Sequence, residues 1–475
     1  MKRAVRIGHV GWKSAGESGA ERIGIGLEKL DRDLYDPTKC YDDLEAIGAR
    51  WVRLQSGWCR TEKVRGVYDF TWLDDIVDAL IARHMRPWIC LCYGNGLYTP
   101  GADNSAGAVG CPPIRTEEER EAWDRYVRAC VSRYRGRVGY YEIWNEPDGS
   151  WCWRPKADAR QYRDFALRTA KAIREADPDA KIIAGSFCTG LDYLYRFLDA
   201  ELARHIDYVT YHRYTFGVEK GTGDYVAAIG AYIRSLDPRL GVIQGETGAP
   251  SRWSTQGAMK RADWTERRQA KYLLRKTVSD LMTDVLFTSY FSTVDIFENI
   301  QDDFVDINER MYGFFGLLGE TFDSDGKPLG KYYRKESFTA MRTLCAVFSA
   351  DVRPQRLPVL FEAAQSTFIG GTEETPDDPA ARLITSGFVR GNGSSAFVYW
   401  KACDVLTEEY ESTVTLRVYG QHGPVRLIDL YTGEVWEPDS AAAACDEGVT
   451  LLSHIPIRDY PLMVTFGDFA PIDFA

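Results

Sequence analysis

The feature that most constrains the fold is an alternation of short apolar runs and longer amphipathic segments between residues 22 and 347. Eight of the runs read as strands, and most of the segments between them show helical periodicity. The expected strands are residues 23–27, 51–55, 87–92, a stretch over 140–147 that ends in Asn-Glu-Pro, 181–185, 206–211, 240–244 and 285–291. Alternation of this kind and length predicts an α/β fold in which eight parallel strands close into a (β/α)8 TIM barrel.

The sequence changes in character after about residue 351. Short, mostly apolar segments follow, separated by Gly, Asp and Asn, which is typical of a small antiparallel β-sandwich. An alternating run near the N-terminus precedes a Gly/Ser-rich break and is expected to join that sandwich. The predicted domains are an N-terminal strand region (1–20), a catalytic barrel (21–348) and a β-sandwich (349–475).

Composition disfavours several functional classes. The formal net charge of −11 argues against a nucleic-acid partner, which calls for a basic face. With no secretory signal and no stretch long enough to span a membrane, we expect a cytoplasmic protein. The 11 cysteines have no repeated spacing and are expected to be reduced, and the 6 histidines lack metal-ligand spacing. No metal and no cofactor are predicted, and a homo-oligomer is compatible with the sequence.

Two glutamates lie at strand ends of the kind that carry the catalytic residues in TIM barrels. Glu146 follows the fourth expected strand and Glu246 the seventh, so both belong to the face formed by the C-terminal strand ends. Cleavage of a glycosidic bond needs one carboxyl that donates a proton and one carboxylate that attacks carbon or activates water. Either glutamate alone would be unremarkable, because most glutamates are surface residues. Together at matching strand ends they predict a catalytic pair.

The residues around this pair resemble a known family. Trp144-Asn145-Glu146-Pro147 and Gly245-Glu246-Thr247-Gly248 are similar to the strand-end motifs of clan A of the retaining glycoside hydrolases. The resemblance implies that Glu146 is the acid/base and Glu246 the nucleophile. A separation of roughly 5 Å between the carboxyl groups would give retention, whereas roughly 6.5–9.5 Å would give inversion.

The same resemblance assigns substrate-binding roles to four other residues. It implies that Asn145 contacts the sugar 2-hydroxyl, that Arg53 lies beside the nucleophile, and that His212 and Tyr214 line the site, with the tyrosine hydrogen-bonded to Glu246. Arg53 could instead pair with a structural carboxylate, and His212 could be a buried core histidine. Strict strand alternation points Asn145 and Glu146 to opposite faces, so we expect a bulged or twisted strand end there.

Loop residues that follow the strands add further candidates for substrate binding. Trp58, Trp151 and Trp253 could stack against the apolar faces of sugar rings, and Asn95 lies in the loop after the third strand. Ordinary loop packing is an equally good explanation for any one of them.

The layout of a barrel with a C-terminal sandwich is most similar to glycoside hydrolase family 39, which includes β-xylosidases and α-L-iduronidase. Many clan members have a tryptophan at the eighth strand, where this chain has Tyr290 and Phe291. The sequence therefore does not predict which sugar is bound. The long loop 99–113 is expected to close one end of the cleft. We therefore predict a retaining, exo-acting, β-xylosidase-like glycosidase for short oligosaccharides or glycosides. An α-L-arabinofuranosidase or another clan A glycosidase is the nearest alternative, and a non-catalytic carbohydrate-binding barrel is an alternative of another class.

Overall fold

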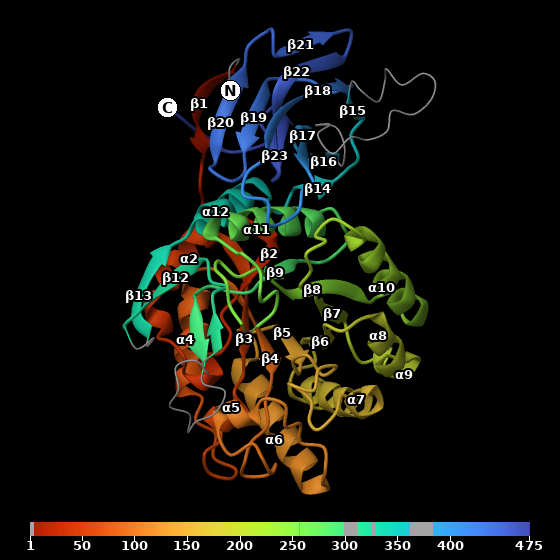
Figure 1. Ribbon diagram of the computed structural model, residues 1–475. Helices are drawn as coiled ribbons and strands as arrows, with labels where there is room; N and C mark the ends of the chain where they lie inside the picture. Colours follow the sequence, from red (N-terminus) through yellow and green to blue (C-terminus); the bar gives the residue numbers. More distant parts are fainter. Residues whose placement is uncertain (1–3, 256, 299–310, 325–327, 362–382) are drawn as a thin grey trace.

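A closed barrel of eight parallel strands forms the centre of the protein (Figure 1). The computed structural model describes residues 4–255, 257–298, 311–324, 328–361 and 383–475. The barrel strands are β2 (Ala20–Gly26), β3 (Ala49–Gln55), β4 (Arg86–Leu91), β5 (Tyr140–Ile143), β6 (Lys181–Phe187), β7 (Tyr208–His212), β8 (Gly241–Thr247) and β9 (Thr288–Tyr290). Parallel pairing of β9 with β2 closes the ring. The predicted TIM barrel is confirmed.

Helices follow most of the barrel strands and cover the outside of the barrel. Those with a predicted counterpart are α2 (Tyr41–Ile47), α4 (Thr71–Ala82), α6 (Glu117–Tyr134), α7 (Ala159–Ala176), α11 (Glu266–Leu281) and α12 (Glu336–Val347). The Thr116 side chain caps α6 by accepting a hydrogen bond from Glu119 N, and Asp158 caps α7 in the same way. These caps explain why the two helices begin where they do.

The sequence-based assignment missed some elements. It named no helix at α8 (Leu191–Phe197), α9 (Ala200–Ala203) or α10 (Thr222–Leu236). It also missed two hairpins, β10 (Ile296–Glu298) with β11 (Met311–Gly313), and β12 (Leu318–Phe322) with β13 (Pro328–Arg334). The last helix, α12, begins only at Glu336, because the residues before it belong to β13.

A separate apolar cluster fills the barrel at the N-terminal ends of its strands. Trp51, Trp88, Ile183, Ile243 and Phe287 form it, and the ring centroids of Trp51 and Trp88 each lie 4.6 Å from that of Phe287. Such layers close the interior of a TIM barrel. A site open to ligands therefore has to lie at the opposite, C-terminal end.

The C-terminal part consists of two antiparallel sheets. The larger has the order β14-β16-β17-β23-β19-β20-β1-β24 and the smaller β15-β18-β22-β21. Their strands are β1 (Ala4–Val10), β14 (Arg353–Pro354), β15 (Val359–Phe361), β16 (Leu383–Val389), β17 (Ser395–Lys401), β18 (Glu411–Tyr419), β19 (Val425–Asp429), β20 (Glu434–Pro438), β21 (Ala443–Asp446), β22 (Val449–Arg458), β23 (Leu462–Phe466) and β24 (Ile472–Phe474). The N-terminal β1 pairs with β20 and β24, so the first strand of the chain lies in the C-terminal sheet.

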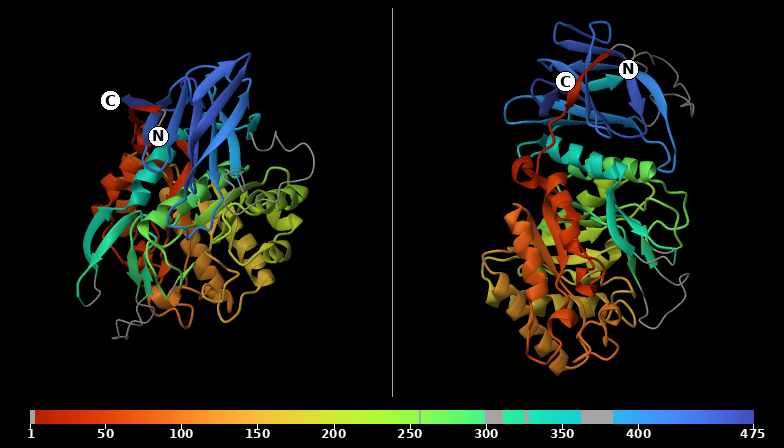
Figure 2. Two further views of the ribbon diagram at one scale, coloured as in Figure 1. Left: turned by 45° about the horizontal axis from the view of Figure 1, so that its top comes forward. Right: turned by 90° about the vertical axis from the view of Figure 1, so that its left-hand side faces the viewer.

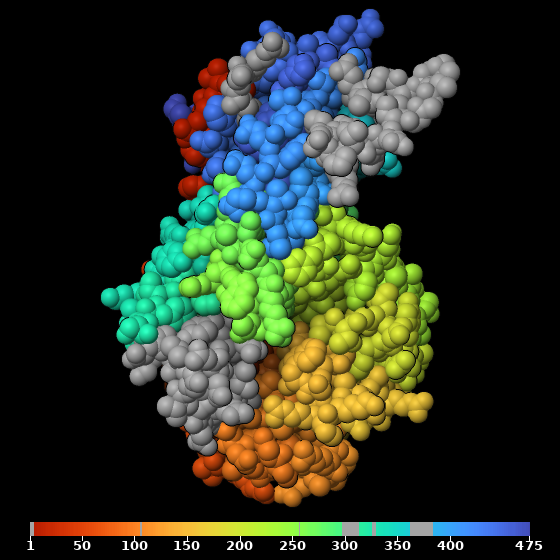
Figure 3. Space-filling model, in the orientation of Figure 1, coloured from red at the N-terminus to blue at the C-terminus, as the bar shows by residue number. Residues whose placement is uncertain are grey.

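The sandwich rests on α11 and α12 of the barrel (Figures 1 and 2). Lys271 of α11 donates to the Thr407 carbonyl at 2.7 Å and forms an ion pair with Asp459, while Arg275 donates to the Cys403 carbonyl at 2.8 Å. The two parts are in direct contact in the space-filling view (Figure 3). Because α11 lies between barrel and sandwich, its residues from Gln269 to Leu281 are all buried.

All 11 cysteines are free thiols. Among the helices of the described residues, none combines the length and the apolar character that crossing a bilayer requires.

Candidate active site

The two glutamates and a histidine meet at the C-terminal end of the barrel. One carboxylate oxygen of Glu146, one of Glu246 and one ring nitrogen of His212 all lie within 4.8 Å of one another. The glutamate side chains are 14% and 12% exposed, and the His212 side chain is fully buried. The barrel topology thus brings the predicted pair together from β5 and β8, with His212 at the end of β7 between them.

The end of β5 is distorted. The strand stops at Ile143, and both Trp144 (φ 66°) and Glu146 (φ 45°) adopt left-handed backbone conformations. Such conformations cost roughly 1–3 kcal/mol each and persist where the surroundings enforce them. The buried Trp144 supplies one such constraint, because its indole N–H donates to the Cys152 carbonyl at 2.8 Å. The expected distortion is present, and it lets Asn145 and Glu146 both reach the site.

Glu246 is held by one donor on each oxygen. Tyr214 donates its hydroxyl to Oε1 at 2.7 Å, and Arg53 Nη1 donates to Oε2 at 2.7 Å. Burial favours the neutral carboxyl, but the charges of His212 and Arg53 and the Tyr214 hydrogen bond outweigh it and lower the pKa of Glu246. The site therefore favours an ionised Glu246.

Arg53 connects more groups than the resemblance implied. Its guanidinium binds Glu142 through two hydrogen bonds of 2.8 Å and donates to Asn145 Oδ1 at 2.8 Å, in addition to Glu246. Burial disfavours the charged guanidinium, yet the Glu142 and Glu246 carboxylates raise the pKa of Arg53 overall. Both explanations of Arg53 thus hold, since it pairs with a buried structural carboxylate and with Glu246.

Two buried carboxyls near Arg53 were missed by the sequence analysis. Glu142 is fully buried in β5, and Glu28, just after β2, is 4% exposed with Oε1 3.4 Å from Arg53 Nη1. An acidic residue inside or next to a buried parallel strand was the available signal, because such strands are otherwise nearly continuous apolar runs.

Glu146 has two partners. Its Oε1 lies 3.0 Å from His212 Nδ1, and its Oε2 accepts a hydrogen bond of 2.6 Å from Trp151 Nε1. Burial lowers the pKa of His212, but the neighbouring Glu246 and Glu146 raise it by more. His212 Nδ1 is also 3.7 Å from Glu246 Oε2, so one imidazole interacts with both carboxylates.

The cluster of Glu146, His212 and Glu246 has donor atoms of the kind that bind metal ions. The surroundings do not suit a cation, however. Both oxygens of Glu246 already accept hydrogen bonds, and one donor is the Arg53 guanidinium at 2.7 Å. A fixed positive charge at that distance repels a cation, so the residues present do not fit a resident metal.

Two predicted binding residues lie elsewhere. Trp58 is completely buried and stacks between Tyr98 and Tyr126, at centroid distances of 5.5 and 5.6 Å. Asn95 is 2% exposed, and its amide donates to the Glu62 carbonyl at 2.8 Å. The structure corrects both expectations, because these side chains pack the loops and present no surface to a ligand.

The other two tryptophans are on the surface. Trp151 is 52% exposed while it bonds Glu146, and Trp253 is 55% exposed in the loop after β8. An exposed ring beside Glu146 suits stacking against a sugar. No hydrogen bond or ion pair joins Trp253 to the carboxylates within the described residues.

The position after the eighth strand differs from the pattern that many clan members share. Tyr290 is buried, with its hydroxyl 3.3 Å from Ala249 N. Phe291 packs edge-on against Phe315, which in turn packs edge-on against Tyr214. Phenylalanine rings thus lie next to the tyrosine that holds Glu246.

Curated relatives match parts of the chain. A β-xylosidase from Geobacillus stearothermophilus is 28% identical over 217 residues, which is 42% of this chain and 42% of that protein. Beta-galactosidase BgaA from Clostridium cellulovorans is 37% identical over 149 residues, 28% of this chain and 22% of that protein. The matches thus span less than half the length of these two relatives.

Solved structures share the fold over nearly the whole chain. A GH39 β-xylosidase from Caulobacter crescentus aligns with a TM-score of 0.56 at 17% identity and covers 98% of both chains. A GH30 endoxylanase from Clostridium papyrosolvens aligns with a TM-score of 0.56 at 10% identity, covering 97% of this chain and 98% of that one. The sequence profile described as "Glycosyl hydrolases family 39" matches residues 32–348, which is most of the chain and includes the barrel strands β3 to β9. The protein therefore belongs to glycosyl hydrolase family 39.

Proposed function

We propose that this protein is a retaining glycoside hydrolase in which Glu246 is the nucleophile and Glu146 the acid/base. The observation that carries the proposal is the spacing of the pair, with one oxygen of each carboxylate within 4.8 Å of the other. Retaining enzymes keep their carboxyl groups roughly 5 Å apart, whereas inverting enzymes leave roughly 6.5–9.5 Å for a water molecule. The short spacing supports attack by the carboxylate itself.

The reaction then has two steps. Glu246 attacks the anomeric carbon and forms a glycosyl ester, while the bond to the leaving oxygen breaks. Glu146 gives its proton to that oxygen, and the leaving group departs as an alcohol. Glu146, now ionised, takes a proton from water, whose oxygen attacks the same carbon and releases Glu246. The first step spends the proton of Glu146 and the second restores it from water, and two successive displacements at the same carbon keep the anomeric configuration.

The surrounding residues suit these roles. Arg53 and Tyr214 fix both oxygens of Glu246, which orients the nucleophile and favours its ionised form. Because Asn145 Oδ1 already accepts a hydrogen bond from Arg53, its amide nitrogen is the end that points elsewhere, and its partner is the weak acceptor Cys152 Sγ at 3.5 Å. An N–H donor in that position supports the role of holding a sugar hydroxyl.

For the substrate we propose a short β-xyloside or a related glycoside. Family 39 membership and the relative named β-xylosidase support this choice. The relative named β-galactosidase is the reason to include glycosides of other sugars. An α-L-arabinofuranosidase is the second candidate. Gly110 in the loop 99–113 pairs with Trp153, and its carbonyl accepts from Arg154 N at 2.7 Å. The loop 99–113 is thus joined to the loop between β5 and α7, and a wall that these two loops build at one end of the cleft supports exo-action.

A panel of nitrophenyl glycosides, with the anomer of the first product read by NMR, tests the proposal. We expect hydrolysis with retention, loss of turnover in Glu246→Ala, and rescue of that variant by azide to give the glycosyl azide of inverted configuration. Near-wild-type turnover by Glu246→Ala would end the nucleophile assignment. Sugar binding without any hydrolysis would favour a carbohydrate-binding barrel.

A further inference from the structure

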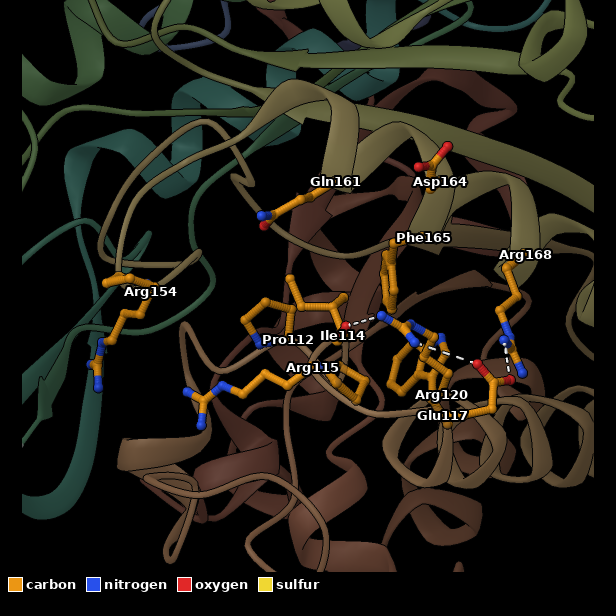
Figure 4. A pocket seen from close by; sticks show the side chains of 13 residues that line it. Pro112, Ile114, Arg115, Glu117, Arg120, Arg154, Gln161, Asp164, Phe165 and Arg168 are labelled. Atoms are coloured by element: carbon orange, nitrogen blue, oxygen red, sulfur yellow. Dashed lines mark hydrogen bonds and ion pairs between the residues drawn. The ribbon is translucent and has the colours of Figure 1, made fainter.

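A cavity of about 600 Å³ lies between α6 and α7 and the loops that precede them (Figure 4). Cavities of roughly 300–1,000 Å³ are usual for sites that hold small ligands. Its lining residues are Pro112, Pro113, Ile114, Arg115, Glu117, Arg120, Trp123, Arg154, Pro155, Gln161, Asp164, Phe165 and Arg168. The proposed mechanism uses none of these residues.

The lining includes two buried aromatic residues that also support the catalytic loop. Trp123 and Phe165 pack against each other with ring centroids 5.3 Å apart. Both also pack edge-on against Trp144, at 5.9 and 5.6 Å, and Trp144 directly precedes Asn145 and Glu146. The cavity is thus one aromatic layer away from the acid/base segment.

Some of the charged groups that line the cavity neutralise one another. Glu117 accepts hydrogen bonds from Arg168 at 2.6 Å and from Arg120 at 3.4 Å. Asp164 pairs with Arg163, which is not part of the lining. The two acidic groups of the lining are therefore engaged by three arginines.

Arg115 and Arg154 supply an excess of positive charge. Arg115 Nη1 makes one long hydrogen bond of 3.4 Å to the Pro100 carbonyl, and the Arg154 side chain has no hydrogen bond or ion pair within the described residues. Both guanidinium groups lie on the same side of the cavity (Figure 4). Burial raises the pKa of the nearby Cys111 thiol, and the charges of Arg154 and Arg115 both act against that rise. This local positive charge contrasts with the formal net charge of −11 of the whole protein.

The loop from β5 to α7 connects the cavity to Glu146. Trp151 donates to Glu146, and two residues later Trp153 donates to Gln161, a lining residue, at 3.3 Å. In a glycosidase the acid/base protonates the oxygen of the leaving group. The part of the substrate nearest to this loop is therefore its leaving-group part.

We propose that the cavity binds a carboxylate carried by the leaving-group part of the substrate, as in a uronic acid residue. Guanidinium groups recognise carboxylates through paired, charge-assisted hydrogen bonds, and the aromatic and proline lining suits the apolar face of a sugar. The assignment to the leaving group rests on the proposed hydrolase function, whereas binding of the carboxylate does not.

The test uses two substrates that share the glycosyl group the enzyme cleaves. One carries a uronic acid in its leaving group and the other carries the matching neutral hexose. We expect wild-type kcat/KM to favour the acidic substrate by about ten-fold, the factor that 1.4 kcal/mol gives. The preference should reside mostly in KM and should shrink with added salt, as screening requires.

Variants assign the effect to the two arginines. Arg115→Ala with Arg154→Ala should abolish the preference and leave kcat/KM for the neutral substrate unchanged. Arg160→Ala is the matched control, because it removes an exposed charge from α7 that does not line the cavity. Equal kcat/KM for both substrates in the wild type would overturn the proposal, and so would an equal loss in Arg160→Ala.

A binding measurement separates this inference from the proposed function. NMR titrations of the Glu246→Gln variant with D-glucuronate and with D-glucose report on the cavity without turnover. If no glycoside is hydrolysed but glucuronate binds selectively and needs the two arginines, the carboxylate site stands and the hydrolase function fails. If hydrolysis occurs but glucuronate shows no arginine-dependent binding, the cavity proposal fails and the function stands.

Discussion

Glu28 should make the stability of the protein depend on pH. The side chain is 4% exposed, its Oε1 shares Arg53 Nη1 with the nucleophile Glu246, and its Oε2 has no partner within the described residues. Arg53 already compensates Glu142 and Glu246. Burial is the largest effect. Together with the charge of Glu246 it outweighs the opposing charge of Arg53 and raises the pKa of Glu28 from 4.5 to about 7.

The sign of the effect follows from where the proton is held. Between pH 4.5 and 7 the folded protein keeps a proton on Glu28 that the unfolded chain has lost, so the free energy of unfolding falls as pH rises. This contribution is complete below pH 4.5 and is lost as pH rises through 7. From pH 5 to pH 8 the loss is about 2.5 kcal/mol. For a barrel of roughly 330 residues, which unfolds with an entropy of ~0.7 kcal/mol/K, that is roughly 3–4 °C in Tm.

Glu28→Gln tests this by calorimetry at pH 5 and pH 8. The amide keeps the shape of the side chain but binds no proton in this range. The Tm of the variant relative to wild type should therefore rise by roughly 3–4 °C from pH 5 to pH 8. Glu121→Gln is the control, since Glu121 is exposed and makes no hydrogen bond or ion pair within the described part of the chain. The same Tm offset at both pH values, for Glu28→Gln as for the control, would refute the reasoning.

Three substitutions test the proposed catalytic roles. Tyr214→Phe removes the hydrogen bond that lowers the pKa of Glu246, so the acidic limb of the kcat/KM profile should move to higher pH, and an unmoved limb would count against the proposed role of Glu246. Trp151→Phe keeps an aromatic ring but loses the N–H that binds Glu146. We expect kcat to fall about ten-fold, as for a lost hydrogen bond of about 1.4 kcal/mol, and unchanged steady-state kinetics would argue against the contact. Arg53→Met leaves carboxylates unpaired and should cost about 3–5 kcal/mol in urea unfolding, whereas a loss below 1 kcal/mol would contradict its central place.

The sequence predicted the barrel because buried parallel strands appear as short apolar runs, which few other structures produce. It did not predict α10, which begins after Gly221 with no side-chain cap. The spacing of Val226, Ile229 and Ile233, all buried in α10, was a usable signal that the sequence analysis overlooked. The hairpins β10–β13 follow β9, where an ordinary barrel would continue directly to its last helix.

At the site, residues at strand ends were easier to place than residues in loops. Arg53, His212 and Tyr214 lie with the two glutamates because barrel topology fixes where strand ends meet. Trp58 and Asn95 lie in loops, whose packing follows no sequence periodicity, and both side chains are buried. The domain boundaries, the cytoplasmic location and the oligomeric state stay predictions from the sequence.

The charges of the site connect the stability of the protein to its proposed chemistry. Four carboxyl groups, Glu28, Glu142, Glu146 and Glu246, lie together there with Arg53 and His212. A buried cluster with net charge is costly. Arg53, His212 and Lys29 all act to lower the pKa of Glu246, whereas burial and the charge of Glu246 raise that of Glu28 to about 7. The proton that Glu28 holds below that pH removes one negative charge from the cluster.

Loss of the Glu28 proton should therefore affect activity as well as stability. Once Glu28 ionises, it competes with Glu246 for Arg53 Nη1 and adds a negative charge beside the nucleophile. That competition weakens the hold of Arg53 on Glu246 and loosens the positioning of the nucleophile. The alkaline decline of kcat/KM should then fall in the same pH range as the loss of stability, and Glu28→Gln should shift both to higher pH. A variant that shifted stability alone would show that Glu28 acts on folding and not on the nucleophile.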